Sequence, residues 1–197
     1  MTLVIGTMAA AALSRAPSKL RTPLAFLFFL PITLPGLFLG ISLLVFFVRV
    51  NMNLSLVTVG IAHTVYVFPY FFLLAKVALD RVDPALEEAG ADLGAGGWKV
   101  FRHVTLPQIW PVLAGAALLA FALSFDEFLI TFFVVGPDST LPLYVWSSLR
   151  RTVTPAINTV STVLMALTIG MWVGAFTLIW IRGLRTPASR AYLEVSP

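Results

Sequence analysis

Hydrophobic residues along the chain fall into long runs rather than short alternating segments. Residues 24–48 contain no charged side chain, and residues 54–79 contain only Lys76, near the end of the run. Residues 109–135 and 156–181 form two further runs of similar length. Because an α-helix of about 20 apolar residues crosses the roughly 30 Å of hydrocarbon in a bilayer, the pattern predicts four membrane-spanning helices.

A fifth apolar segment, residues 1–13, is too short to span a bilayer alone. We interpret it as the end of a helix whose first part is absent, so an N-terminal truncation is expected. Positive charges follow this segment rather than precede it, which argues against a signal peptide. Valine and isoleucine occur in runs of helical length, unlike the alternating strands of membrane barrels. The predicted fold class is an all-α integral membrane protein, a polytopic helical bundle forming one domain over residues 1–197.

The composition strengthens this interpretation and excludes other classes of protein. Hydrophobic residues make up 59% and charged residues 11% of the 197-residue chain, and the mean hydropathy is +0.95. Soluble domains carry about 25% charged residues, so a disordered chain and an ordinary soluble enzyme are excluded. The net charge of +4 forms no basic patch, so no nucleic-acid partner is expected. The chain has no cysteine, Walker A motif, catalytic triad or metal-ligand cluster, so neither catalysis nor a metal site is expected.

The distribution of lysine and arginine between the loops predicts the orientation of the spans. Ten of these residues lie in or beside residues 14–23, 80–108 and 182–197, whereas three lie in the alternate loops, residues 49–53 and 136–155. Cytoplasmic loops are enriched in positive charge. The first three segments, including the C-terminus, are therefore expected in the cytoplasm.

The segment 80–108 is the long charged loop on the predicted cytoplasmic side. Asp83 is a favourable N-cap, and Pro84 is a favourable first helical residue. These two residues predict a short helix over residues 85–93.

The rest of this loop predicts a second short helix before the next span. Gly94, Gly96 and Gly97 should end the first helix, residues 98–104 should form the second, and Pro107 should mark the entry to the span. Two short helices between spans suggest an element that docks a partner. The alternative is a plain solvated loop.

The run Glu88-Ala89-Gly90 is followed after three residues by Gly94, and after nine more by Val104-Thr105-Leu106-Pro107. This run resembles the EAA motif of ABC importer permeases, which reads Glu-Ala-Ala, three residues, Gly, nine residues and Ile-x-Leu-Pro, and the spacing matches it throughout. Gly90 replaces the second alanine, which lowers helix propensity by up to about 1 kcal/mol, and Val104 replaces isoleucine. The resemblance implies that the residues coupling this permease to an ATPase are Glu88, Ala89, Gly90, Asp92, Gly94, Val104, Leu106 and Pro107.

Further features are similar to the spermidine/putrescine permease branch of this family, its second permease subunit in particular. They are the proline-rich span 24–48 and the short runs 123–127, 136–137 and 141–143. The resemblance implies the type I ABC importer permease fold, with six spans per subunit. The four complete spans here would be the third to the sixth.

The resemblance also implies a mechanism and a set of partners. Two permease subunits would form the pathway in the bacterial inner (plasma) membrane, and two ATPase subunits would receive the loop helices. A periplasmic or lipid-anchored binding protein would deliver the substrate. No cofactor is expected in this chain, because ATP and Mg²⁺ would bind to the ATPase partner. The implied function is polyamine uptake. The alternatives are a permease for another small solute, such as an organic amine, phosphonate or ion, and a non-transporting truncated membrane interaction protein.

Asp126 and Glu127 are predicted to lie close to the membrane centre, within the span 109–135. Intramembrane carboxylates cost several kcal/mol and usually face a cavity or a partner. Because adjacent helical residues point about 100° apart, one should face the pathway and the other a neighbouring helix or subunit, and which is which stays open. An anionic pathway would lower the desolvation penalty of a polyamine. The alternative is a carboxylate paired or protonated within the bundle.

His63, Tyr66 and Tyr70 have the spacing of one polar, aromatic stripe on the span 54–79. Aromatic rings attract ammonium groups, so this stripe is a candidate substrate contact. The alternative is a set of packing residues with internal partners. Pro31 and Pro35 interrupt the span 24–48, which indicates either a broken span beside a pathway or a simple kink.

Overall fold

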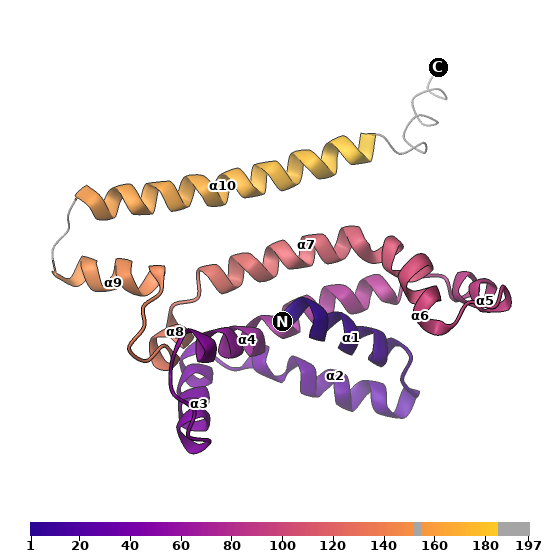
Figure 1. Ribbon diagram of the computed structural model, residues 1–197, viewed down its shortest axis with the longest axis horizontal. Helices are drawn as coiled ribbons and strands as arrows, with labels where there is room; N and C mark the ends of the chain where they lie inside the picture. Colours follow the sequence, from indigo (N-terminus) through magenta and orange to yellow (C-terminus); the bar gives the residue numbers. More distant parts are fainter. Residues whose placement is uncertain (152–154, 185–197) are drawn as a thin grey trace. The chain divides into compact units, whose positions relative to one another are not determined.

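The computed structural model describes residues 1–151 and 155–184, and the described part is helical, without a strand (Figure 1). The predicted all-α fold class is therefore confirmed. The residues pack into two compact units, Met1–Tyr144 and Val145–Pro197, which are described separately.

The first unit contains most of the helices. In chain order they are α1 (Thr2–Ser14), α2 (Ser18–Thr33), α3 (Gly36–Arg49), α4 (Leu56–Leu79), α5 (Pro84–Asp92), α6 (Gly97–Val100), the π-helical turn η1 (Phe101–Thr105), α7 (Leu106–Phe125) and α8 (Leu129–Val134). The helix α9 (Leu141–Arg151) crosses the boundary between the units, and α10 (Pro155–Leu184) belongs to the second.

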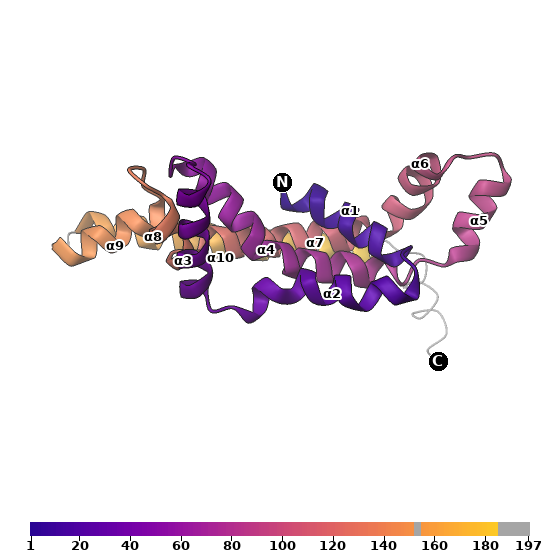
Figure 2. The ribbon, with the colours of Figure 1, turned by 90° about the horizontal axis from the view of Figure 1, so that it is seen from below.

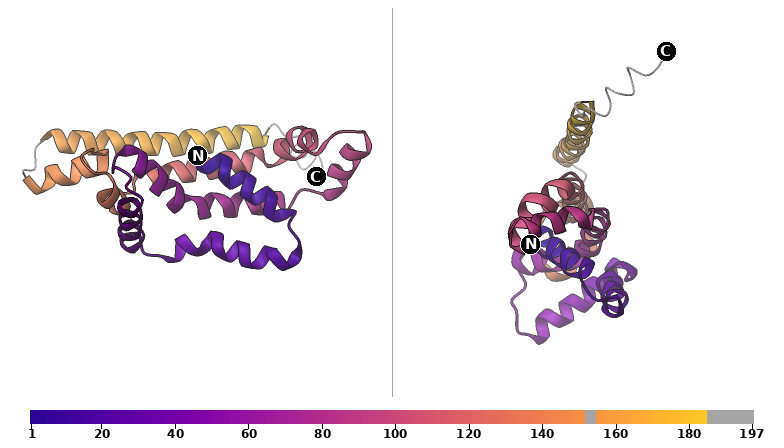
Figure 3. Two further views of the ribbon diagram at one scale, coloured as in Figure 1. Left: turned by 60° about the horizontal axis from the view of Figure 1, so that its bottom comes forward. Right: turned by 90° about the vertical axis from the view of Figure 1, so that its right-hand side faces the viewer.

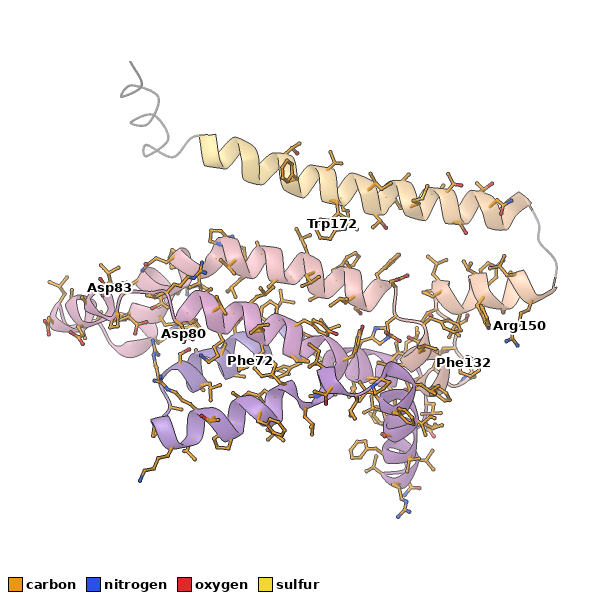
Figure 4. The ribbon with its side chains drawn as sticks, turned by 180° about the vertical axis from the view of Figure 1, so that it is seen from behind. Phe72, Asp80, Asp83, Phe132, Arg150 and Trp172 are labelled. Atoms are coloured by element: carbon orange, nitrogen blue, oxygen red, sulfur yellow. The ribbon has the colours of Figure 1, made fainter. Side chains whose placement is uncertain are left out.

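The helix α4 is the centre of the first unit, with α1, α2 and α7 packed against it (Figure 3). Phe71 and Phe72 on α4 are fully buried in this core, and Figure 4 shows Phe72 among these helices. Gly6 on α1 allows the close approach, because a Cβ atom there would lie 2.5 Å from Cδ1 of Phe71. The predicted fifth apolar segment, residues 1–13, therefore forms part of this core.

A second hydrophobic cluster joins α3, α8 and the first half of α4. Phe47, Val59, Ile130 and Val134 are buried there. Gly40 brings α3 against α8, since a Cβ atom at this position would lie 2.9 Å from a ring carbon of Phe133. The two clusters together fix α4 along its whole length.

The apolar run 24–48 forms two helices rather than one. The axes of α2 and α3 meet at 104°, and the bend is clear in Figure 2. Pro35 disfavours helical backbone at the residue before it, and Leu34 is accordingly extended, with ψ of 126°. Pro35 thus lies at a full break and not at a mild kink, whereas Pro31 lies inside the last turn of α2.

The run 109–135 is also divided. Helical backbone continues without interruption from Gly97 to Phe125, stops, and resumes as α8. The second loop helix and the span are thus one element, so Pro107 does not mark a boundary between them. Proline has no N–H and clashes with the carbonyl four residues earlier, and the π-helical turn directly before Pro107 accommodates it.

Two helical stretches of the described residues, Leu56–Leu79 and Gly97–Phe125, are long and apolar enough to cross a membrane. The bent α2–α3 pair makes a third if it counts as one span. The predicted run 156–181 falls within α10, whose described apolar segment is Ser161–Gly174. In this second unit the Arg150 guanidinium lies 4.7 Å from the ring centre of Trp146.

Candidate functional site

The helix α5 of the predicted docking loop begins at a capped N-terminus. The Asp83 side chain accepts a hydrogen bond of 2.9 Å from the Ala85 N–H, and Pro84 occupies the first helical position. Both residues therefore perform the roles that their order in the sequence predicts. Figure 4 shows Asp80 at the end of α4 and Asp83 farther out, where α5 begins.

The same helix ends in a Schellman motif, in which two backbone N–H groups satisfy the last carbonyls. Gly94 has φ of +81° and donates to Ala91 O at 2.8 Å, while Ala95 donates to Gly90 O at 3.2 Å. Residues with a Cβ atom avoid this left-handed conformation. The backbone conformation at position 94 thus requires glycine. The predicted coupling residue Asp92 is the last residue of α5.

Gly90 lies against the helix that leads into α7. A Cβ atom at Gly90 would lie 3.3 Å from Cγ2 of Val100 and 3.7 Å from Cγ2 of Val104. The two positions that depart from the EAA motif, Gly90 and Val104, are therefore close to each other. Both carry a smaller side chain than the motif residue, which allows α5 to pack closely on η1.

Glu87 joins three elements of the chain, and the sequence pattern did not single it out. Its Oε1 accepts a hydrogen bond of 2.5 Å from the Thr105 hydroxyl on η1 and one of 3.0 Å from the Arg15 guanidinium after α1. Thr105 is fully buried. The Thr105 hydroxyl, and after it Arg15, hold the pKa of Glu87 below its ordinary value, against the opposing effect of partial burial. The partners lie 18 and 72 residues away, so no local motif could reveal this joint.

Beyond these contacts, α5 and α6 present an exposed surface at one end of the first unit (Figures 1 and 2). Leu93 is 89% and Trp98 is 70% exposed, and the Trp98 ring stacks on Phe101 at 5.8 Å. Large apolar groups on an otherwise polar loop are typical of a surface that binds a partner. Five of the eight predicted coupling residues are exposed, namely Glu88, Ala89, Asp92, Gly94 and Pro107, whereas Gly90, Val104 and Leu106 are half-buried.

Asp126 and Glu127 lie at the break between α7 and α8, so the expectation that both occupy one continuous helix is corrected. Asp126 caps the C-terminus of α7 through its backbone N–H and is exposed. Glu127 is half-buried, and its Oε1 accepts a 2.8 Å hydrogen bond from the Ile130 N–H at the start of α8. A carboxylate is favourable at a helix N-terminus because unpaired N–H groups and the helix dipole stabilise negative charge.

His63 connects α4 to both sides of this break. Its Nδ1 lies 2.8 Å from the Ser124 hydroxyl on α7, and its Nε2 lies 2.7 Å from the Thr131 hydroxyl on α8. Thr131 is buried and donates to the Glu127 carbonyl at 2.9 Å. Both ring nitrogens therefore have internal partners, which is what the packing interpretation of His63 expects.

A partly open cavity of about 250 Å³ lies beside the break. Its wall consists of His63, Phe121, Ser124, Phe125, Glu127, Thr140, Leu141 and Pro142. The structure thus brings His63 and Glu127 to one space. It leaves Tyr66 and Tyr70 off this wall, with their rings in edge contact at 5.9 Å, and it leaves Asp126 off the wall as well. Within the described residues, no group of three or more histidine, aspartate or glutamate side chains is placed to hold a metal ion.

Comparison with known proteins identifies relatives across most of the chain. Residues 2–190 match the family described as "Binding-protein-dependent transport system inner membrane component". The putrescine transport system permease protein PotI of Escherichia coli (strain K12) is 36% identical over 170 residues, which cover 82% of this chain and 60% of that protein. The spermidine/putrescine transport system permease protein PotC of the same strain is 30% identical over 169 residues, covering 85% of this chain and 64% of that protein.

The fold also has a counterpart of known structure. A chain of the MetNI methionine ABC transporter, in an inward-facing conformation, matches with a TM-score of 0.74 at 20% identity, covering 91% of this chain and 87% of the other. The predicted permease fold is therefore confirmed. The chain spans less than two thirds of the length of the two curated permeases above.

Proposed function

The chain belongs to the family of binding-protein-dependent transport system inner membrane components, and from that premise we propose that it is a permease subunit of an ABC importer for polyamines such as putrescine and spermidine. The observation that carries the proposal is the 36% identity to a putrescine permease over 82% of the chain. The capped, exposed docking loop would bind the ATPase subunit, and the Glu127 carboxylate beside a cavity would contact the cationic substrate.

The proposed coupling element is α5 with the start of the following helix. A short helix capped at both ends is rigid enough to transmit a rigid-body movement of a partner. The ATPase partner would contact the exposed face that carries Glu88, Ala89 and Asp92, and it would bind the ATP and Mg²⁺. Because Glu87 ties α5 to Thr105 at the base of α7, a displacement of α5 would move α7 with it.

The proposed pathway contact is the Glu127 carboxylate at the break. An ammonium group that enters a membrane loses its hydration, and a carboxylate in the pathway offsets part of that cost. Asp126 is exposed and would face a second permease subunit or the pathway mouth. His63 would hold Ser124 and Thr131 in place on the two sides of the break, and Tyr66 and Tyr70 would contact the substrate further along α4.

The docking loop and the C-terminus would face the cytoplasm, and the subunit would work with several partners. The excess of lysine and arginine supports a cytoplasmic position for the docking loop and the C-terminus. A second permease subunit, a periplasmic or lipid-anchored binding protein and the lipid bilayer would complete the assembly. The alternatives remain uptake of another small solute, such as an organic amine, phosphonate or ion, and a non-transporting membrane interaction protein.

Uptake of labelled putrescine and spermidine tests the substrate directly. A deletion strain would carry this chain with its partner subunits, as wild type, Glu127→Gln or Asp126→Asn. We expect uptake by the wild type and a strong reduction in Glu127→Gln. Uptake of 2-aminoethylphosphonate without polyamine uptake would favour the other-solute alternative, and unchanged uptake in both variants would remove the carboxylates from the mechanism.

Capture of the ATPase partner tests the docking loop. Gly94→Trp forces a bulky side chain into a left-handed position and should reduce recovery of the ATPase in a pull-down. Gly60→Ala is the matched control, because a Cβ atom there has open space around it on α4. Equal recovery with both variants would contradict the docking role.

A further inference from the structure

The wall of the cavity beside the α7–α8 break carries one polar atom that the fold leaves unsatisfied. The Thr140 hydroxyl is buried and has no hydrogen-bond partner among the described residues. Its own carbonyl accepts from the Tyr144 N–H at 2.8 Å, so the backbone of Thr140 is held at the start of α9. A buried polar atom without a partner costs free energy, so a group that binds in the cavity and forms a hydrogen bond with this hydroxyl would recover that cost.

Glu127 provides the charge of this cavity. Its Oε1 caps α8, and no hydrogen bond to its Oε2 occurs within the described part of the chain. The wall contains no lysine or arginine. The cavity therefore favours a cation, and it opposes an anionic group.

Two phenylalanine rings complete the surroundings. Phe121 and Phe125 stack at 5.6 Å with an angle of 22° between their planes, and they are 49% and 41% exposed. The face of an aromatic ring attracts an ammonium group. The rings thus offer a weakly hydrated surface beside the carboxylate and the hydroxyl.

The size of the cavity limits what it can hold. A water molecule occupies roughly 30 Å³, so about 250 Å³ accommodates several waters or one small group. Pockets for drug-sized ligands run from about 300 to 1,000 Å³. The cavity suits one end of an extended molecule rather than a whole ring-containing ligand.

We propose that this cavity binds one primary alkylammonium group, which donates hydrogen bonds to the Glu127 carboxylate and the Thr140 hydroxyl and lies against Phe121 and Phe125. This proposal rests on the proposed function. It states that the cavity holds one ammonium end of the substrate, and it identifies Thr140 as a residue that determines the affinity for the substrate. The Ser124 hydroxyl, held by His63, borders the same space.

The test uses the complete transporter in proteoliposomes with labelled putrescine. Thr140→Val keeps the shape of the side chain and removes the hydroxyl. We expect the KM for putrescine to rise roughly tenfold, as for loss of one hydrogen bond to a charged group, with little change in the maximal rate. The matched control is Ser139→Ala, which removes an exposed neighbouring hydroxyl that contacts only the Thr140 carbonyl at 3.3 Å.

Two further measurements separate ligand binding from a structural role. The melting temperature of the empty Thr140→Val protein should equal or exceed that of the wild type, because the substitution removes an unsatisfied buried hydroxyl. Diacetylated putrescine, which has no ammonium group, should not compete with uptake. An unchanged KM in Thr140→Val, or competition by the diacetylated compound, would overturn the inference alone. Failure of the wild type to move any polyamine would overturn the proposed function together with it.

Discussion

The docking loop and the α7–α8 break are both candidate sites in one unit, but they are built in different ways. The two ends of the loop helix α5 depend on contacts between near neighbours in the sequence, such as Asp83 with Ala85 and Gly94 with Ala91, although Glu87 also ties this helix to a distant partner. The break depends on His63, whose two partners lie 61 and 68 residues away. A site made of local contacts can be predicted from residue order, whereas a site made of distant contacts cannot.

This difference also predicts how each region responds to substitution. Loss of a distant contact at the break removes the connection between whole helices. Loss of a local contact in the loop should change the backbone of only one turn of α5. Substitutions at the break should therefore destabilise the protein more than substitutions in the loop.

His63→Leu should have the largest effect on stability. It removes two hydrogen bonds that join α4 to α7 and α8, and it leaves the Ser124 hydroxyl without this partner. A loss of about 2–4 kcal/mol in the free energy of unfolding is expected from two hydrogen bonds and an unsatisfied polar group. Reversible unfolding in detergent measures it. Thr64→Ala is the control, since this exposed hydroxyl bonds only to Gly60 O. If the two variants were equally stable, the break would not depend on His63.

Gly94→Ala should have an intermediate effect that stays local. The left-handed backbone at φ of +81° disfavours any residue with a Cβ atom by about 1–2 kcal/mol. Steric crowding is not the cause of this destabilisation, because nothing lies within 4 Å of the added Cβ atom. Hydrogen exchange of α5 should therefore increase while exchange of α4 stays unchanged. Gly96→Ala is the matched control, as Gly96 has φ of −64°. Increased exchange in α4 as well would contradict a local role.

Acidification should have a smaller effect than these substitutions, by weakening the attachment of α5 to Thr105 and Arg15. The folded pKa of Glu87 lies below its ordinary value because the Thr105 hydroxyl and Arg15 favour the carboxylate. Its contribution to stability is thus complete above the ordinary pKa, about 4.3, and is lost as the pH falls through the lower folded value. Hydrogen exchange of α5 against pH should show this loss in the wild type. A Glu87→Gln variant that kept the same pH dependence would exclude Glu87 as its source.

Gly90→Ala should have the smallest net effect. Alanine raises helix propensity by up to about 1 kcal/mol over glycine, while its Cβ would press on Val100 at 3.3 Å. The two effects oppose each other, so the stability should change by less than about 0.5 kcal/mol. Adding Val100→Ala removes the side chain on which the new Cβ would press, so Gly90→Ala should be stabilising in that background. The double-mutant cycle measures the coupling between the positions, and a coupling of zero would mean that they are not packed together.

Much of the loop was predictable in detail, and much of the break was not. The N-cap at Asp83, the helix that follows it and the glycine at its end agree with the sequence prediction to within a residue. The carboxylates were expected on one helix, yet α7 ends just before Asp126 and Glu127 caps the next helix. Hydrophobicity alone continues through both α7 and α8, so no periodicity marks the interruption.

The sequence by itself determined the helical membrane fold and the docking loop, because apolar length and helix capping act within one or a few turns. The tertiary structure decided where apolar runs break, which polar atoms share a cavity and how Glu87 joins α1, α5 and η1. The physical reason is distance along the chain. A hydrogen bond between Glu87 and Arg15 spans 72 residues, and its partners are paired only when the packing of α1 against α4 brings the two segments together.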